Sequence, residues 1–235
     1  MRMRSAILPF LLLRCAAGLG SERALAQTQP QGSHSADGPA KSSSGQVDGI
    51  AVHIEDDILT ESELRELAAF QQLVDGASKD RNELIRELTD QWILRTEADA
   101  AKYPQPSAAD IDRAFSQLQK QFPSAAEFKA KFVSVGLSET AVRRQLALQL
   151  YLSRFIDYRF RPAAQVDDDQ IEVYYNNEFA PQLKARKQAV PALDDVQDTI
   201  REVLVQREIN ERAQQWLNES RERLAIDVVP HGGGL

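Results

Sequence analysis

Side chains able to carry out chemistry are few in this sequence and poorly spaced for it. The three histidines are His34, His53 and His231. Two fall in polar terminal stretches, and His53 lies in an alternating stretch typical of a partly exposed strand. No zinc-site spacing occurs, no serine has a histidine–acid pair beside it, and glycine-rich phosphate-binding motifs are missing. We therefore predict no catalytic residue, no metal and no cofactor.

The aspartate run from Asp167 to Asp169 could be read as a cation site. Adjacent carboxylates at the start of a helix point in different directions, which suits a metal poorly. A helix N-terminus favours negative charge by about 0.3–1 kcal/mol. We therefore interpret the run as a helix cap, and Asp194 and Asp195 as a repeat of the same device.

Aromatic side chains in the middle of the chain are the remaining signal, and burial in the core explains most of them. In residues 149–160 (QLYLSRFIDYRF), however, aromatics occupy too many helical positions for one narrow stripe, and in residues 172–179 (EVYYNNEF) adjacent tyrosines cannot both face the core. Exposed aromatics on helices make adaptable contacts with extended apolar polypeptide. The candidate residues for binding unfolded polypeptide clients are Phe115, Phe122, Phe128, Phe132, Tyr151, Phe155, Tyr158, Tyr174, Tyr175 and Phe179.

The elements that must position these side chains are almost all helical. Five pairs resembling capping boxes, the first being Thr60 and Glu63, each precede an apolar pattern of period 3.6. Between Ile50 and Val229 the only glycines are Gly76 and Gly136, each where a helix is expected to end. The expected helices span residues 61–74, 81–103, 108–121, 125–135, 139–160, 168–179 and 193–223.

Two short alternating stretches, residues 50–54 and 225–229, predict strands at opposite ends of this helical part. A lone strand leaves backbone groups unpaired, so we expect the two to pair with each other and to pack on the helices. The predicted fold class is mainly α: a multi-helix core with a short two-stranded β-ribbon joining its N- and C-terminal ends.

The N-terminal residues have the layout of a secretory signal peptide, 1–26, with early arginines, a short apolar run and small residues before the expected cleavage site. Cys15, the only cysteine, falls within it. Residues 27–46 read as a disordered linker, and 230–235 as a tail. Removal of residues 1–26 takes four arginines and one glutamate, which changes the net charge from −7 to −10. So acidic a protein is a poor ligand for nucleic acid or anionic lipid, and we expect neither nucleic acid binding nor stable membrane insertion.

Several stretches together resemble the SurA-type periplasmic chaperones. The residues VDGIAVHIEDDILTESEL, beginning at Val47, resemble the first strand, turn and helix of that family, and the helices up to IEVYYNNEF follow in the same order. Residues 47–179 thus resemble the family's N-terminal domain, and 193–229 its returning C-terminal helix and strand. Residues Tyr103 to Pro106 depart from the usual small or glycine-containing break.

The resemblance implies an ATP-independent holdase that binds unfolded outer-membrane proteins in the periplasm. In many relatives a parvulin-type prolyl isomerase domain of about 90 residues lies between the tyrosine-rich helix and the C-terminal helix. Here residues 180–192 leave room only for a short linker, so we expect no enzyme. Two alternatives stay open: prolyl isomerase activity by family association, and a non-catalytic homodimeric scaffold that hides the aromatic surface.

Overall fold

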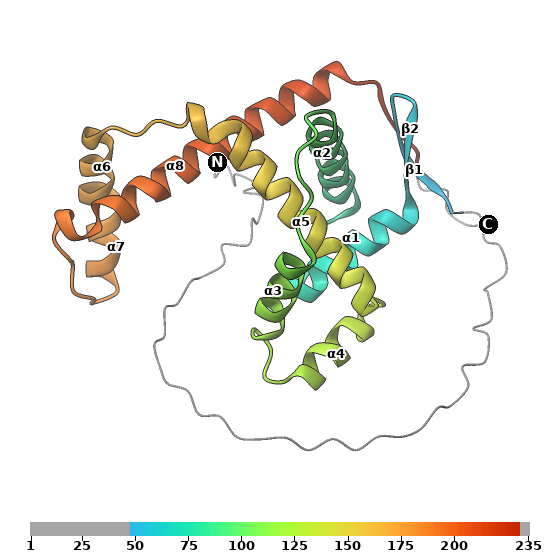
Figure 1. Ribbon diagram of the computed structural model, residues 1–235, viewed down its shortest axis with the longest axis horizontal. Helices are drawn as coiled ribbons and strands as arrows, with labels where there is room; N and C mark the ends of the chain where they lie inside the picture. Colours follow the sequence, from blue (N-terminus) through green and yellow to red (C-terminus); the bar gives the residue numbers. More distant parts are fainter. Residues whose placement is uncertain (1–47, 231–235) are drawn as a thin grey trace. The chain divides into compact units, whose positions relative to one another are not determined.

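The computed structural model describes residues 48–230, and helices make up most of that part of the chain (Figure 1). The predicted signal peptide and the whole predicted linker lie outside the described residues, as do His34 and residues 231–235 of the tail. No helix within residues 48–230 is long and apolar enough to cross a membrane. The helices are α1 Glu61–Val74, α2 Arg81–Ala100, α3 Ala108–Gln119, α4 Ala125–Ser134, α5 Glu139–Phe160, α6 Asp168–Tyr174, α7 Ala180–Ala185 and α8 Leu193–Arg223.

Side-chain caps define where most of these helices begin. The Thr60 hydroxyl accepts a hydrogen bond from the backbone N–H of Glu63 at 3.3 Å, and the Glu63 carboxylate accepts from the Thr60 N–H at 2.8 Å. Asp167 and Gln170 cap α6 in the same reciprocal way, which confirms the cap predicted at the aspartate run. Each such cap satisfies backbone donors that a helix leaves free at its first turn.

The chain ends meet in a three-stranded antiparallel sheet of order β2-β1-β3, made of β2 Asp57–Thr60, β1 Ile50–Ile54 and β3 Ile226–Val228. The predicted pairing of the first and last strands is confirmed, since Val52 lies opposite Val228. The prediction of two strands was wrong, because β2 follows β1 through a two-residue turn. A four-residue strand is too short to display alternation, and its acidic start suggested only a turn.

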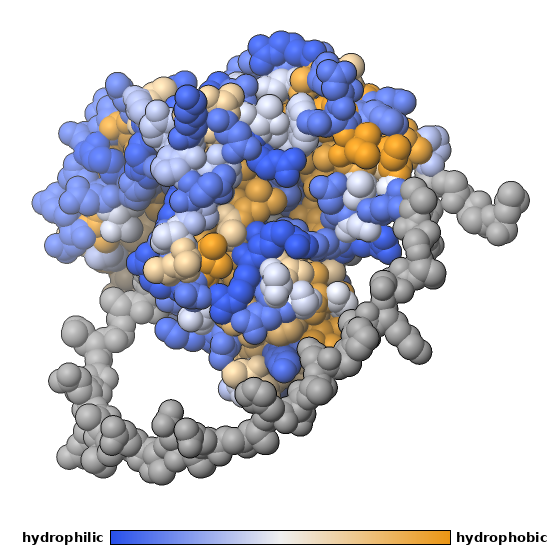
Figure 2. Space-filling view, turned by 45° about the vertical axis from the view of Figure 1, so that its right-hand side comes forward, coloured by the Kyte–Doolittle hydropathy of each residue, from blue (hydrophilic) through white to orange (hydrophobic). Residues whose placement is uncertain are grey.

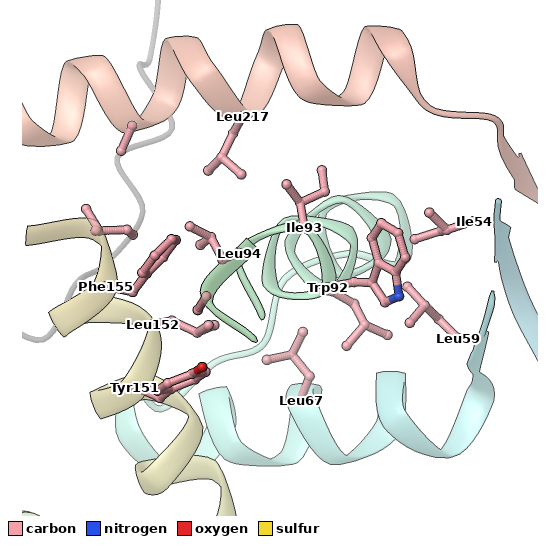
Figure 3. Packing of buried hydrophobic residues seen from close by; sticks show 14 of the residues in the cluster. Ile54, Leu59, Leu67, Trp92, Ile93, Leu94, Tyr151, Leu152, Phe155 and Leu217 are labelled. Carbon is pink, nitrogen blue, oxygen red and sulfur yellow. The ribbon is translucent and has the colours of Figure 1, made fainter. Parts of the chain in front are cut away.

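Two hydrophobic clusters hold the helices together. The main core joins the sheet to α1, α2, α5 and the C-terminal half of α8. Figure 3 shows α2 at its centre: Trp92 faces the sheet residues Ile54 and Leu59, and Leu217 of α8 lies on another side. A second core joins α3 and α4 to the end of α1 and the start of α5, around Phe70 and Phe128. The main core fixes α1, α2 and α5 relative to one another, and the second core attaches α3 and α4 to α1 and α5.

The long helix α8 runs from the sheet at one end to α6 and α7 at the other (Figure 1). Between α6 and α7 the chain forms one π-turn, Tyr175–Phe179, just before Pro181. Pro181 lacks an N–H to continue an α-helical ladder, and a wider turn accommodates it. The helical path therefore continues to Ala185, and the linker predicted to start at 180 begins at 186. We call residues 168–185 the arm.

Candidate binding groove

A groove of about 380 Å³ lies where α1, α2 and α5 converge beside β2. Its position follows from the main core, which brings the three helices together without filling the space above their contact line. Pockets of this size accommodate small ligands or a few side chains. The lining residues are Leu59, Glu63, Glu66, Leu67, Leu88, Gln91, Trp92, Arg95, Arg144, Gln145 and Leu148.

The floor of the groove is apolar and rigidly held. Leu59, Leu67, Leu88 and Trp92 are each at most 9% exposed, because their other sides belong to the main core. The Trp92 Nε1–H donates to Asp57 Oδ2 at 3.0 Å, which fixes the indole ring against β2. A floor of this kind presents apolar surface to a ligand with little further loss of side-chain entropy.

The α1 and α5 sides of the rim are polar groups already bonded to one another. Glu66 accepts a hydrogen bond from Gln145 Nε2 at 2.7 Å and forms an ion pair with Arg144. Glu63 is engaged in the cap of α1. On the α2 side, the side chains of Gln91 and Arg95 make no hydrogen bond or ion pair with any described residue. Only the α2 side therefore offers free polar groups to a ligand.

A second hollow, of about 400 Å³, lies between the arm and α8. Val173, Tyr174 and Leu204 supply its apolar surface, and acidic residues surround them. Arg207 closes one side: its Nη1 donates to Glu178 Oε1 at 3.0 Å, and its guanidinium lies 5.2 Å from the centre of the Tyr174 ring. The Arg207 hydrogen bonds lower the pKa of the Glu178 carboxyl. Arg207, the cation that lines this hollow, is therefore already paired with Glu178.

Four of the ten predicted client-binding aromatics are core residues, which makes that part of the prediction wrong for this conformation. Phe128, Phe132, Tyr151 and Phe155 are at most 4% exposed. Tyr151 also donates its hydroxyl to Asp99 Oδ1 at 2.7 Å, and burial together with that carboxylate raises its pKa to about 12. The helices cross at angles that turn more than one stripe inward, so a count of aromatic positions overestimated exposure.

The other six predicted aromatics keep some exposure but do not form one surface. Phe115 and Phe122 pack on the second core at its edge. Tyr158 is 62% exposed on α5, with its ring 5.2 Å from that of Tyr103. In the arm, the Tyr175 hydroxyl donates to the Pro191 carbonyl at 2.7 Å and its ring stacks with that of Phe179 at 5.9 Å. Tyr174 alone lines a hollow, as described above.

The groove residues were not singled out from the sequence, because their pattern is the one that any core residue of an amphipathic helix shows. Leu67, Leu88 and Leu148 read as core positions of amphipathic helices, and the sequence does not say that one edge of each stays open. Arg95 had a weaker signal that could have been followed, namely a cation close behind the buried Trp92 and Ile93 on α2. Within residues 48–230, no group of three or more His, Cys, Asp or Glu side chains is arranged to hold a metal ion.

The fold and the groove define a helical domain that is closed by pairing of its end strands and carries an open apolar site. Its sequence is 31% identical over 137 residues to the chaperone SurA of Ralstonia nicotianae, and the alignment covers 54% of this chain. Over that stretch the chain is therefore similar in sequence to a SurA-type chaperone. The aligned part is 27% of the Ralstonia protein, so the chain matches about a quarter of that relative's length.

One solved structure is similar to this fold, at a lower sequence identity. It comes from work on PEB4 and Cj1289 of Campylobacter jejuni, described as two structurally related SurA-like chaperones. The TM-score is 0.48 at 12% identity, with 78% of this chain and all of that chain covered. No family model matches the sequence.

Proposed function

We propose that this protein is an ATP-independent holdase that binds unfolded polypeptide in the groove between α1, α2 and α5. The observation that carries the proposal is the apolar floor of Leu59, Leu67, Leu88 and Trp92, open to solvent on a protein related to SurA. Release would follow mass action, since the proposal includes no nucleotide hydrolysis to drive it. The N-terminal signal-peptide pattern supports a periplasmic location, and the resemblance to SurA-type chaperones supports outer-membrane proteins as clients.

An extended client segment suits the groove better than a folded surface does. Successive side chains of an extended chain point to opposite sides, so one apolar side chain can enter while its neighbours stay in solvent. The free amide of Gln91 can donate to and accept from client backbone. Figure 2 shows further hydrophobic surface (orange) scattered among hydrophilic residues (blue), and Ile58, Tyr158 and Val173 are exposed apolar side chains that could extend the contact.

The test fills the groove without disturbing the core. Gln91 has no partner to lose, so Gln91→Trp places a large ring over the floor. Gln117→Trp, on the exposed side of α3, is the matched control. Purified wild-type protein and the control should suppress aggregation of an unfolded outer-membrane protein at near-stoichiometric ratio, measured by light scattering. Gln91→Trp should need several-fold more protein.

Two results would contradict the proposal. If folded wild-type protein leaves aggregation unchanged, the protein is not a holdase. If Gln91→Trp suppresses aggregation as well as Gln117→Trp does, clients bind elsewhere on the molecule. Circular dichroism of each variant establishes that it is folded before the comparison is made.

We also propose that binding involves no catalysis. Residues 186–192 join α7 to α8 directly in the described part of the chain, at the position where the resemblance would place a prolyl isomerase domain. A proline-peptide isomerisation assay should show no acceleration over buffer at micromolar protein. A clear acceleration would overturn this proposal and leave the groove untouched.

A further inference from the structure

The groove carries one free cation, and we propose that it selects extended client segments in which an acidic side chain lies two residues from a large apolar one. The apolar side chain rests on the floor beside Trp92, and Arg95 binds the carboxylate. The inference rests on the proposed function, since it names which unfolded segments the groove prefers.

The groove suits an acidic client side chain because the charged groups on the two sides of its rim differ in whether they already have partners. The carboxylates of Glu63 and Glu66 are engaged by the helix cap, Arg144 and Gln145, so they neither attract a client cation strongly nor repel a client carboxylate at full strength. Arg95 is exposed and has no partner among the described residues. The rim carries two carboxylates and two guanidiniums, and Arg95 is the one charged group among them whose side chain has no hydrogen-bond or ion-pair partner in residues 48–230.

The guanidinium of Arg95 suits this ligand by its shape as well as its charge. Its N–H groups form a planar fork that can donate two parallel hydrogen bonds to one carboxylate. Beside an apolar floor such a pair is screened less than one in open solvent. A client amide in the same place would accept one bond and bring no charge.

The spacing of two residues follows from the geometry of α2. Leu88 and Arg95 are seven residues apart, which is about 10 Å along a helix rising 1.5 Å per residue. An extended chain rises about 3.3 Å per residue, and its side chains i and i+2 share a side, about 7 Å apart. An apolar side chain near the middle of the floor therefore leaves the next same-side residue within reach of the long Arg95 side chain.

The experiment measures peptide affinity with Trp92 as reporter. The chain has two tryptophans, so Trp216→Phe leaves Trp92 on the groove floor as the single tryptophan, which can be excited selectively. The probes are two short peptides, capped at both ends, in which phenylalanine is followed two residues later by glutamate in one and by glutamine in the other. The glutamate peptide should bind about tenfold more tightly, the effect of one charge-assisted pair.

The variants assign that difference to one residue. Arg95→Gln should bind both peptides equally, at the affinity of the glutamine peptide. Arg86→Gln makes the same charge change on the same helix, outside the groove, and should keep the tenfold preference. The preference should also shrink as salt is raised.

The outcomes separate this inference from the function on which it rests. Equal binding of both peptides by the protein with intact Arg95 overturns the carboxylate subsite and leaves the groove as a binding site. An equal loss in Arg86→Gln and Arg95→Gln overturns it too, because net charge would then explain the effect. If neither peptide changes Trp92 fluorescence or binds by calorimetry, both the subsite and the groove are wrong.

Discussion

The main core and the arm are built from the same kind of amphipathic helix, yet they are held by different forces. The main core buries residues from the sheet and four helices, including Trp92, Phe155 and Leu217. In the arm and the part of α8 beside it, the buried apolar residues Ile171, Ala180 and Ile200 belong to neither core. Burial of apolar surface therefore stabilises the first region far more than the second.

Polar contacts supply much of what fastens the arm. Arg201 donates through Nη1 to the Val166 carbonyl at 2.9 Å and through Nη2 to Asp168 at 2.6 Å. Arg207 of α8 likewise donates through Nη1 and Nη2 to the carboxylate of Glu178 in the arm, each at 3.0 Å. Partly exposed ion pairs contribute little each, so we expect the arm to open before the main core does. Regions with few buried contacts are the ones that a protein can move at low cost in free energy.

The largest effect should come from emptying the main core. Phe155→Ala removes a side chain that is 1% exposed and should lower the free energy of unfolding by about 3–5 kcal/mol. Urea unfolding followed by circular dichroism measures the change. Tyr158→Ala, one turn along α5 at 62% exposed, should cost no more than about 1.5 kcal/mol, mainly through its ring contact with Tyr103. Equal costs would contradict the assignment of the core.

A smaller and pH-dependent effect should come from the buried ion pair of the main core. Asp90 is 4% exposed; burial raises its pKa, and the adjacent Arg221 guanidinium opposes that rise. Arg221→Gln leaves the carboxylate buried without its cation and should cost about 3 kcal/mol at pH 7. The variant Asp90→Asn combined with Arg221→Gln should recover part of that loss.

The cost in stability of Arg221→Gln should depend on pH, and the direction of that dependence follows from the pKa of Asp90. A raised pKa means that the folded protein holds the Asp90 proton more tightly than the unfolded chain does. Stability from this group is thus complete below about pH 4 and is lost as the pH rises through the folded pKa. Removal of Arg221 raises that pKa further, so the cost of Arg221→Gln should be smaller at pH 5 than at pH 7.5. A cost independent of pH would show that the Asp90 carboxyl is not responsible.

The smallest effect on global stability should come from the arm. Ile171→Ala should speed hydrogen exchange across residues 168–185, while the main transition in urea shifts by less than about 1 kcal/mol. Val173→Ala, two residues away and 58% exposed, is the control and should leave exchange unchanged. If Ile171→Ala shifted the whole unfolding transition as Phe155→Ala does, the arm and the main core would be one cooperative unit.

Local patterns predicted the elements well where the causes are local. The bounds expected for α1, α5 and α8 are those observed, because capping residues and a period of 3.6 act within a few residues of each helix end. The strand pairing of Ile50–Ile54 with Ile226–Val228 also followed, since neither strand could satisfy its backbone alone. Strand β2 and the continuation of the arm through Pro181 were not predicted. Both depend on pairing and packing that local patterns do not display.

What this sequence determined by itself is the set of helices, the closure of the chain ends in a sheet, and the similarity of part of the chain to a SurA-type chaperone. Which side chains face solvent was decided only by the tertiary structure. Exposure depends on how helices cross, so Phe155 and Tyr158, three residues apart on α5, end at 1% and 62% exposed. For the same reason the site lies over Leu67, Leu88 and Trp92, whose patterns read as plain core, because three helices that meet around one core leave a groove along their junction.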